Sequence, residues 1–198
     1  DPDLTESQAE LGRILFLGRQ TEQAREKMEL VLDREPGHWT GRLVKAMLLV
    51  SEEKPEEAKS LLKTLIEEKP DRVEPYFILT GIHAAEDDLD AAAGTLEDLL
   101  AQDTTNRAGR VRLAMILERQ GNLEDAEKEY QTLLEQYPED REPKFRLVRF
   151  YERNERAEEA EATLKELISE NPNDPGLRTA LAQYYAQEDR REDVEQVL

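Results

Sequence analysis

The sequence predicts an all-α protein built from short helices, and three observations support this fold class. Apolar residues recur at spacings of three and four along almost all of the 198 residues, as in Leu96, Leu99 and Leu100. This spacing is the helical period. No stretch alternates between apolar and polar residues for long enough to form a strand. Short polar breaks that contain proline separate the helical segments, since proline cannot continue a helix.

The breaks recur at a constant interval of about 34 residues, the length of a known class of helical repeat. The interval from Pro36 to Pro70 equals that from Pro138 to Pro172, and the interval from Pro70 to Pro138 is twice as long. The missing member of the series falls on Thr104. Twelve residues before each of these positions stands an alanine. The five alanines are Ala24, Ala58, Ala92, Ala126 and Ala160. This period indicates a repeat architecture, with one pair of helices in each repeat.

The first helix of each repeat carries its own markers. One position holds a leucine in every repeat except the second, which has Lys45. The leucines are Leu11, Leu79, Leu113, Leu147 and Leu181. The next position holds mostly small residues, where we expect two helices to approach closely. These residues are Gly12, Ala46, Thr80, Ala114, Val148 and Ala182.

These markers resemble the pattern of the tetratricopeptide repeat family, which runs Trp, Leu-Gly, Tyr, Ala, Phe and Pro over about 34 residues. The clearest copy contains Leu113-Ala114, Leu117, Gly121, Ala126, Tyr130 and Pro138. The sequence departs from the family pattern at the tryptophan position, which holds Gln8, Arg42, Tyr76, Arg110, Lys144 and Arg178. In chain order, the register gives repeats at 5–38, 39–72, 73–106, 107–140, 141–174 and a partial repeat at 175–198.

The resemblance implies a right-handed α-solenoid of stacked helix–turn–helix repeats that forms one array over residues 1–198. Each pair of helices is too small to bury its own apolar face, so neighbouring repeats complete the core. The resemblance also places the first helices on the concave wall and the second helices on the convex wall.

Composition excludes several classes of function. With 27 basic and 46 acidic residues, the net charge of −19 disfavours binding to nucleic acid and to anionic membrane surfaces. No apolar run is long enough to span a membrane, so we expect no direct membrane insertion. The chain has no cysteine, which fits either the cytoplasm or a bacterial periplasm or envelope. Because the chain opens without methionine, we expect it to be part of a longer protein.

The search for catalytic chemistry is negative. His38 and His83 are the only histidines, and no HExxH pair, phosphate-binding glycine loop or GxSxG motif is present. Asp87, Asp88 and Asp90 cluster in a predicted turn but lack the spacing and the glycine of a calcium loop. We therefore expect no bound metal, no cofactor and no enzymatic activity.

The concave groove is the candidate site, because this family binds extended or helical peptides there. The resemblance points to nine groove residues: Leu43, Met47, Phe77, Val111, Arg112, Met115, Phe145, Arg146 and Arg149. This set is apolar in the middle repeats and basic toward the C-terminal half, which predicts a peptide with apolar anchors and an acidic end. The alternative is that some of these residues pack against the adjacent repeat. A receptor for chaperone tails is disfavoured, since the lysine and asparagine of its carboxylate clamp are missing.

The predicted function is therefore a non-catalytic scaffold for protein–protein interaction that binds a peptide segment of a partner. The alternative is a tetratricopeptide repeat segment of a larger enzyme or of a bacterial polysaccharide-export or envelope protein.

Overall fold

The computed structural model describes residues 2–197, which form twelve helices and no strand. The all-α fold class is confirmed. The chain divides into two compact units, Asp1–Gln120 and Gly121–Leu198, and each is described by itself. The single array of six repeats stays a prediction, and its two end residues, Asp1 and Leu198, lie outside the described residues.

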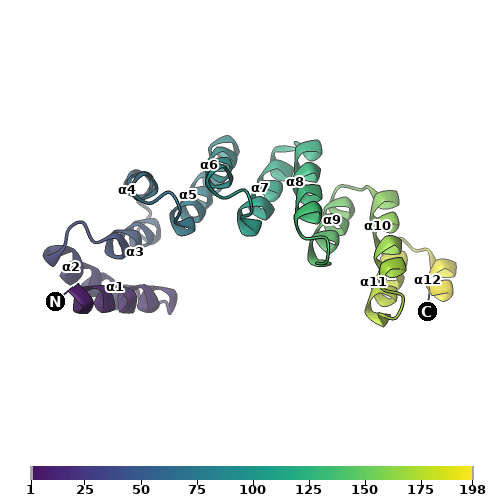
Figure 1. Ribbon diagram of the computed structural model, residues 1–198, viewed down its shortest axis with the longest axis horizontal. Helices are drawn as coiled ribbons and strands as arrows, with labels where there is room; N and C mark the ends of the chain where they lie inside the picture. Colours follow the sequence, from purple (N-terminus) through teal and green to yellow (C-terminus); the bar gives the residue numbers. More distant parts are fainter. Residues whose placement is uncertain (1, 198) are drawn as a thin grey trace. The chain divides into compact units, whose positions relative to one another are not determined.

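The first unit contains seven helices, which make up three sequential pairs and one further helix (Figure 1). They are α1 (Pro2–Leu17), α2 (Thr21–Arg34), α3 (Trp39–Ser51), α4 (Pro55–Glu68), α5 (Val73–Ala85), α6 (Leu89–Gln102) and α7 (Arg107–Gln120). Each helix packs against the next one along the chain. The polar breaks of the sequence lie between α2 and α3, between α4 and α5, and between α6 and α7.

The second unit contains five helices with the same alternation. They are α8 (Leu123–Gln136), α9 (Glu142–Arg153), α10 (Ala157–Glu170), α11 (Pro175–Gln187) and α12 (Arg191–Val197). Here too, sequential helices pack against one another.

The turn within each repeat has one residue in the left-handed region. These residues recur once per repeat period, with φ between 56° and 80°, and they are Arg19, Glu53, Asp87, Gly121, Glu155 and Asp189. A residue in this conformation just past the end of a helix allows a following amide to bond back to the last turn. The Lys54 amide, for example, donates to the Leu49 carbonyl. Five of the six positions hold a residue other than glycine. A side chain with a Cβ atom is strained in this region, whereas glycine is not.

Small residues decide how closely the paired helices approach. All five alanines of the repeat series have no exposed surface. At Gly12, a Cβ atom would lie 2.2 Å from the Met28 Cε atom on α2. The small residues expected on the first helices are therefore found at close helix–helix contacts.

Neighbouring helices bury apolar side chains between them inside each unit. In the first unit, Leu79 and Ile82 of α5 pack with Leu62 and Leu65 of α4. In the second unit, the rings of Tyr130 on α8 and Phe150 on α9 lie 5.5 Å apart. In both cases the second helix of one repeat covers the first helix of the next, as expected for stacked repeats.

Candidate functional site

The predicted groove residues of the first unit fall into two groups by exposure. Leu43 and Val111 are buried, with 3% and 8% of their surface exposed. They therefore belong to the packing between helices, which was the alternative interpretation for these positions. Met47 and Phe77 are half-buried, and Arg112 and Met115 are exposed. Only this second group offers surface to a partner.

Phe77 and Arg112 are the two members of this group that lie in contact. The Arg112 guanidinium carbon lies 4.3 Å from the centroid of the Phe77 ring, a cation–π contact between α5 and α7. One turn along α5, Gly81 has no heavy atom within 4 Å of the place where a Cβ would stand. The space beside the ring is therefore open. We call Met47, Phe77, Gly81, Arg112 and Met115 the Phe77 face.

The predicted residues of the second unit lie on α9. Phe145 is half-buried and Arg149 is exposed. Arg146 forms an ion pair with Glu142 one turn earlier on the same helix. Arg149 has no ion-pair partner among the described residues. Of the two predicted groove arginines on α9, Arg149 is therefore the one whose charge a ligand could use without competing with Glu142.

Family models identify the repeat. A model described as Tetratricopeptide repeat matches residues 43–107 and 111–175, together more than half of the chain. The chain belongs to the tetratricopeptide repeat family. Tetratricopeptide repeats typically mediate protein–protein interaction, and the family generally acts as a non-catalytic scaffold. No curated protein matches the chain significantly.

Solved structures show the same fold at low sequence identity. A tetratricopeptide repeat protein from Parabacteroides merdae is 14% identical, with a TM-score of 0.69 over 98% of this chain and 77% of its own. PilF of Pseudomonas aeruginosa is 12% identical, with a TM-score of 0.70 over 99% of this chain and 89% of its own. A thermophilic tetratricopeptide repeat protein from Thermus thermophilus is 19% identical, with a TM-score of 0.61 over 92% of this chain and 99% of its own.

The tryptophan position of the tetratricopeptide repeat is filled here by residues that bond to the neighbouring loop or helix. The Tyr76 hydroxyl donates to the Pro70 carbonyl at 3.2 Å. Arg110 and Arg178 each donate to the carbonyl six residues earlier, Thr104 or Pro172. In these three repeats, hydrogen bonds to loop carbonyls thus fix the start of the first helix.

A charged cluster on the second unit was not found from the sequence. The Tyr151 hydroxyl donates to Glu127 Oε1 at 2.6 Å, and Arg156 Nη1 donates to Glu127 Oε2 at 2.6 Å. The Arg156 guanidinium also lies 4.6 Å from the centroid of the Tyr151 ring. Burial opposes ionisation of Glu127, but hydrogen bonds from Arg156 and Tyr151 outweigh it and lower its pKa.

The same cluster recurs one repeat later. The Tyr185 hydroxyl donates to Glu161 Oε1 at 2.9 Å, Arg190 pairs with Glu161, and the Arg190 guanidinium lies 4.4 Å from the Tyr185 ring centroid. Hydrogen bonds from Arg190 and Lys165 lower the pKa of Glu161 to about 2. The recurrence of glutamate, tyrosine and arginine at one register was the sequence signal that could have revealed these clusters.

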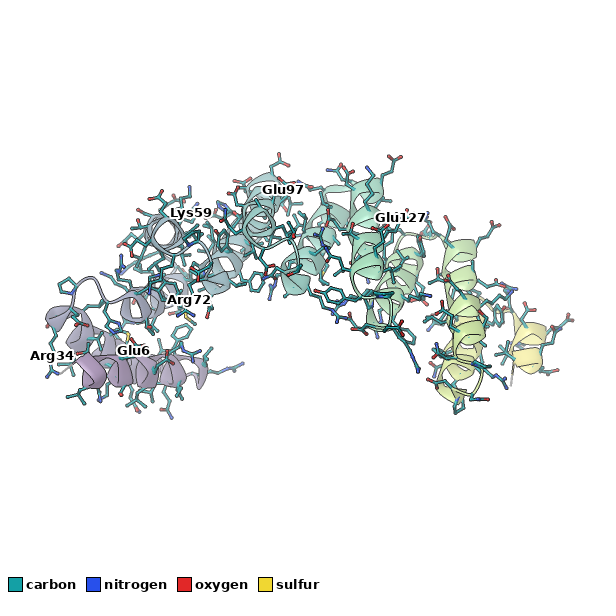
Figure 2. The ribbon with its side chains drawn as sticks, viewed as in Figure 1. Glu6, Arg34, Lys59, Arg72, Glu97 and Glu127 are labelled. Atoms are coloured by element: carbon teal, nitrogen blue, oxygen red, sulfur yellow. The ribbon has the colours of Figure 1, made fainter. Side chains whose placement is uncertain are left out.

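In two repeats of the first unit, the position equivalent to Glu127 and Glu161 holds a cation in place of the glutamate. Arg25 on α2 pairs with Glu52 at the end of α3, and Lys59 on α4 pairs with Glu86 at the end of α5. At this position α2 and α4 carry a cation, whereas α8 and α10 carry an anion. Figure 2 marks Lys59 on α4 and Glu127 on α8, which occupy equivalent positions two repeats apart.

The histidines and the aspartate cluster have structural roles. His83 is 8% exposed, and burial lowers its pKa. His38 Nδ1 accepts a hydrogen bond from the Gly41 amide at 3.2 Å and caps α3. Asp88 caps α6 by accepting from the Ala91 amide, and Asp87 is the left-handed turn residue. Among the described residues, no group of three or more acidic or histidine side chains could hold a metal ion.

None of the described helices is both long and apolar enough to cross a bilayer.

Proposed function

We propose that this chain is a protein-interaction scaffold that binds a peptide segment of a partner on the first-helix face of its repeats. The Phe77 face would hold an apolar side chain of the peptide, and an acidic side chain would pair with Arg112. The observation that carries the proposal is the contact between the half-buried Phe77 ring and the exposed Arg112, one turn from the open space at Gly81.

The chemistry of the Phe77 face fits such a ligand. Met47 and Met115 supply unbranched, polarizable side chains that adapt to different apolar groups. Arg112 lies over the Phe77 ring, and the guanidinium N–H groups that do not face the ring are donors for a carboxylate. Met115 is 51% exposed, so this apolar side chain has surface to bury when a partner binds.

Phe145 and Arg149 on α9 offer a second candidate face, in the second unit. The half-buried Phe145 ring stands one turn before the exposed Arg149. We propose this face as a separate contact for an acidic peptide.

A peptide array tests the proposal. The probes are short synthetic peptides with two leucine or phenylalanine anchors, followed by aspartate, by lysine or by serine. We expect the acidic series to bind best. Phe77→Ala should weaken binding by about 1–3 kcal/mol, as anchor residues do, and Arg112→Glu should abolish the preference for aspartate.

Leu30→Ala provides the matched control, since Leu30 is an exposed leucine of the same unit on a second helix. It should leave peptide binding unchanged. Equal binding of all three peptide series, or acidic-peptide binding that survives Phe77→Ala at full strength, would contradict the proposal.

A further inference from the structure

Two cations lie over the ring of Trp39, the single tryptophan of the chain. The Nζ atom of Lys69 is 5.4 Å and the guanidinium carbon of Arg72 is 5.3 Å from the centroid of this ring. Both distances are within the range of cation–π contacts. Trp39 begins α3, and the two cations belong to the loop between α4 and α5, where Figure 2 labels Arg72. We call these three residues the Trp39 cluster.

The ring of the Trp39 cluster is held in place, and its cations are exposed. Trp39 is half-buried and packs against the core that contains Leu43 and Leu62. Both cations are exposed, and neither forms an ion pair with a described residue. The neighbouring Glu68 does not serve them, because Arg42 binds both of its oxygens. The cluster therefore presents two positive charges that no described carboxylate neutralises.

The start of α5 also lacks the acceptor that the equivalent helices have. At four of the five loops between repeats, all within the described residues, one register position accepts a hydrogen bond from an amide at the start of the following helix. These acceptors are His38, Asn106, Asp140 and Asp174. The fifth loop has Arg72 at this position, whose side chain has only donors and makes no capping bond. The positive end of α5 therefore adds to the charges of the cluster.

The side chains of the Trp39 cluster offer donors and no acceptor. Indole, ammonium and guanidinium groups can only donate hydrogen bonds. The Nε1 atom of Trp39 is buried and has no hydrogen-bond partner among the described residues, which is costly for a polar group. An anion would bring the acceptors that this place in the fold lacks.

We propose that the Trp39 cluster binds neighbouring carboxylates of an acidic peptide segment on a partner protein. The planar guanidinium of Arg72 can hold one carboxylate by two parallel hydrogen bonds, and the compact ammonium of Lys69 can pair with the next. The carboxylates would also offset the positive end of α5. The net charge of −19 disfavours a long polyanion, so the occupant is a short acidic segment.

The fluorescence of Trp39 tests the proposal directly, because no other tryptophan contributes to the signal. The probe is a synthetic glycine–serine peptide that carries one aspartate–glutamate pair, and its control carries asparagine and glutamine instead. We expect a saturable change in fluorescence with the acidic peptide alone. Arg72→Gln should weaken this binding by about tenfold, as the loss of a charge-assisted hydrogen bond does, and Lys69→Gln should weaken it as well.

Two further variants separate binding from folding. Arg34→Gln is the matched control, because Arg34 is another exposed arginine of the same unit, at the end of α2, and it should leave binding unchanged. Arg72→Asp introduces the residue type that stands at the equivalent positions Asp140 and Asp174. It should therefore cap α5, raise the melting temperature and abolish binding of the acidic peptide.

Three results would overturn the proposal. They are equal binding of the acidic and amide peptides, full-strength binding by Arg72→Asp, and a lower melting temperature of Arg72→Asp, which would show that the start of α5 needs the cation itself. The probes carry no apolar anchor for the Phe77 face, so this inference and the proposed function can fail separately.

Discussion

The Tyr151 hydroxyl donates a hydrogen bond to the Glu127 carboxylate across the contact between α9 and α8, and Arg156 binds the other oxygen of the same carboxylate. These bonds join residues that are far apart in the sequence. They connect the second helix of one repeat to the first helix and turn of the next. The stability of the second unit should therefore depend on them more than on its exposed ion pairs.

Replacing Tyr151 by phenylalanine should lower the free energy of unfolding by about 1–2 kcal/mol, because the ring can stay in place but the half-buried carboxylate loses a hydrogen bond. Urea denaturation would measure this change. Asp125→Asn is the control, because Asp125 pairs with Lys128 at a well-hydrated surface and should change stability by less than about 0.5 kcal/mol. Equal effects of the two substitutions would contradict the prediction.

Acid should weaken the second unit through Glu161. Its pKa in the folded chain is about 2, below the ordinary value of 4.5. Folding therefore favours the ionised form of Glu161. Its contribution to the free energy of unfolding is complete above the ordinary pKa and disappears as the pH falls toward the pKa of the folded chain. Glu161→Gln should be less stable than the unmodified chain at neutral pH, and the difference should shrink in this acidic range. Denaturation midpoints at several pH values measure it, and a difference that stays constant with pH would exclude the mechanism.

His83 should destabilise the first unit at mildly acidic pH. Burial lowers its pKa from the ordinary value of 6.5, although Asp88 acts in the opposite direction. Below that ordinary value, the unfolded chain takes up the proton more readily than the folded chain, so stability falls. His83→Leu should remove this pH dependence and raise stability by about 1 kcal/mol, because Nδ1 of His83 is buried without a hydrogen bond. Denaturation midpoints between neutral and mildly acidic pH measure both effects, and a variant that keeps the full acid sensitivity would contradict them.

The left-handed turn residues offer a test in both directions. Glu53→Gly and Glu155→Gly should each raise stability by about 0.5–1 kcal/mol, because glycine adopts positive φ without strain. Gly121→Ala should lower stability by a similar amount, since the position has open space and only the backbone conformation opposes a Cβ. Thermal unfolding of the three variants measures these changes. Destabilisation by both glycine substitutions would show that the glutamate side chains matter more than the strain.

The fold could be predicted because one short period repeats with little variation. Ala24 and its four equivalents are completely buried, so each repeat has the same small residue at the same place in its core. The regular spacing of this constraint identifies both helices of each repeat. Helix bounds follow the same register, with α3 beginning at Trp39 and α5 at Val73, the first residues of two predicted repeats.

The candidate site could be predicted only in part, because one register position has different exposure in different repeats. Leu43 and Val111 are buried, whereas Phe77 and Phe145 at the same position are half-buried. Thr179, at the same position in the last repeat, is exposed. Exposure at this position therefore depends on the neighbours that each repeat provides, and periodicity alone does not report it.

The ion pairs between repeats could not be predicted from the sequence pattern either. Arg25 and Glu127 occupy equivalent positions but carry opposite charges, and each has its partner in the following repeat. Charged residues are so abundant in this sequence that the pattern alone does not indicate which of them form ion pairs. The structure shows which side chains lie together.

This change of sign limits how the repeats can be rearranged. If the segment that contains Tyr151 and Arg156 were joined directly after α4, the cation of Lys59 would face another cation, and the tyrosine would lose its acceptor. Each repeat is therefore compatible with only some neighbours, although all share one backbone. A chain built by duplicating or exchanging repeats would need to keep both residues of each charge pair. The segment to exchange therefore begins in the second helix of one repeat and ends after the turn that follows the first helix of the next repeat.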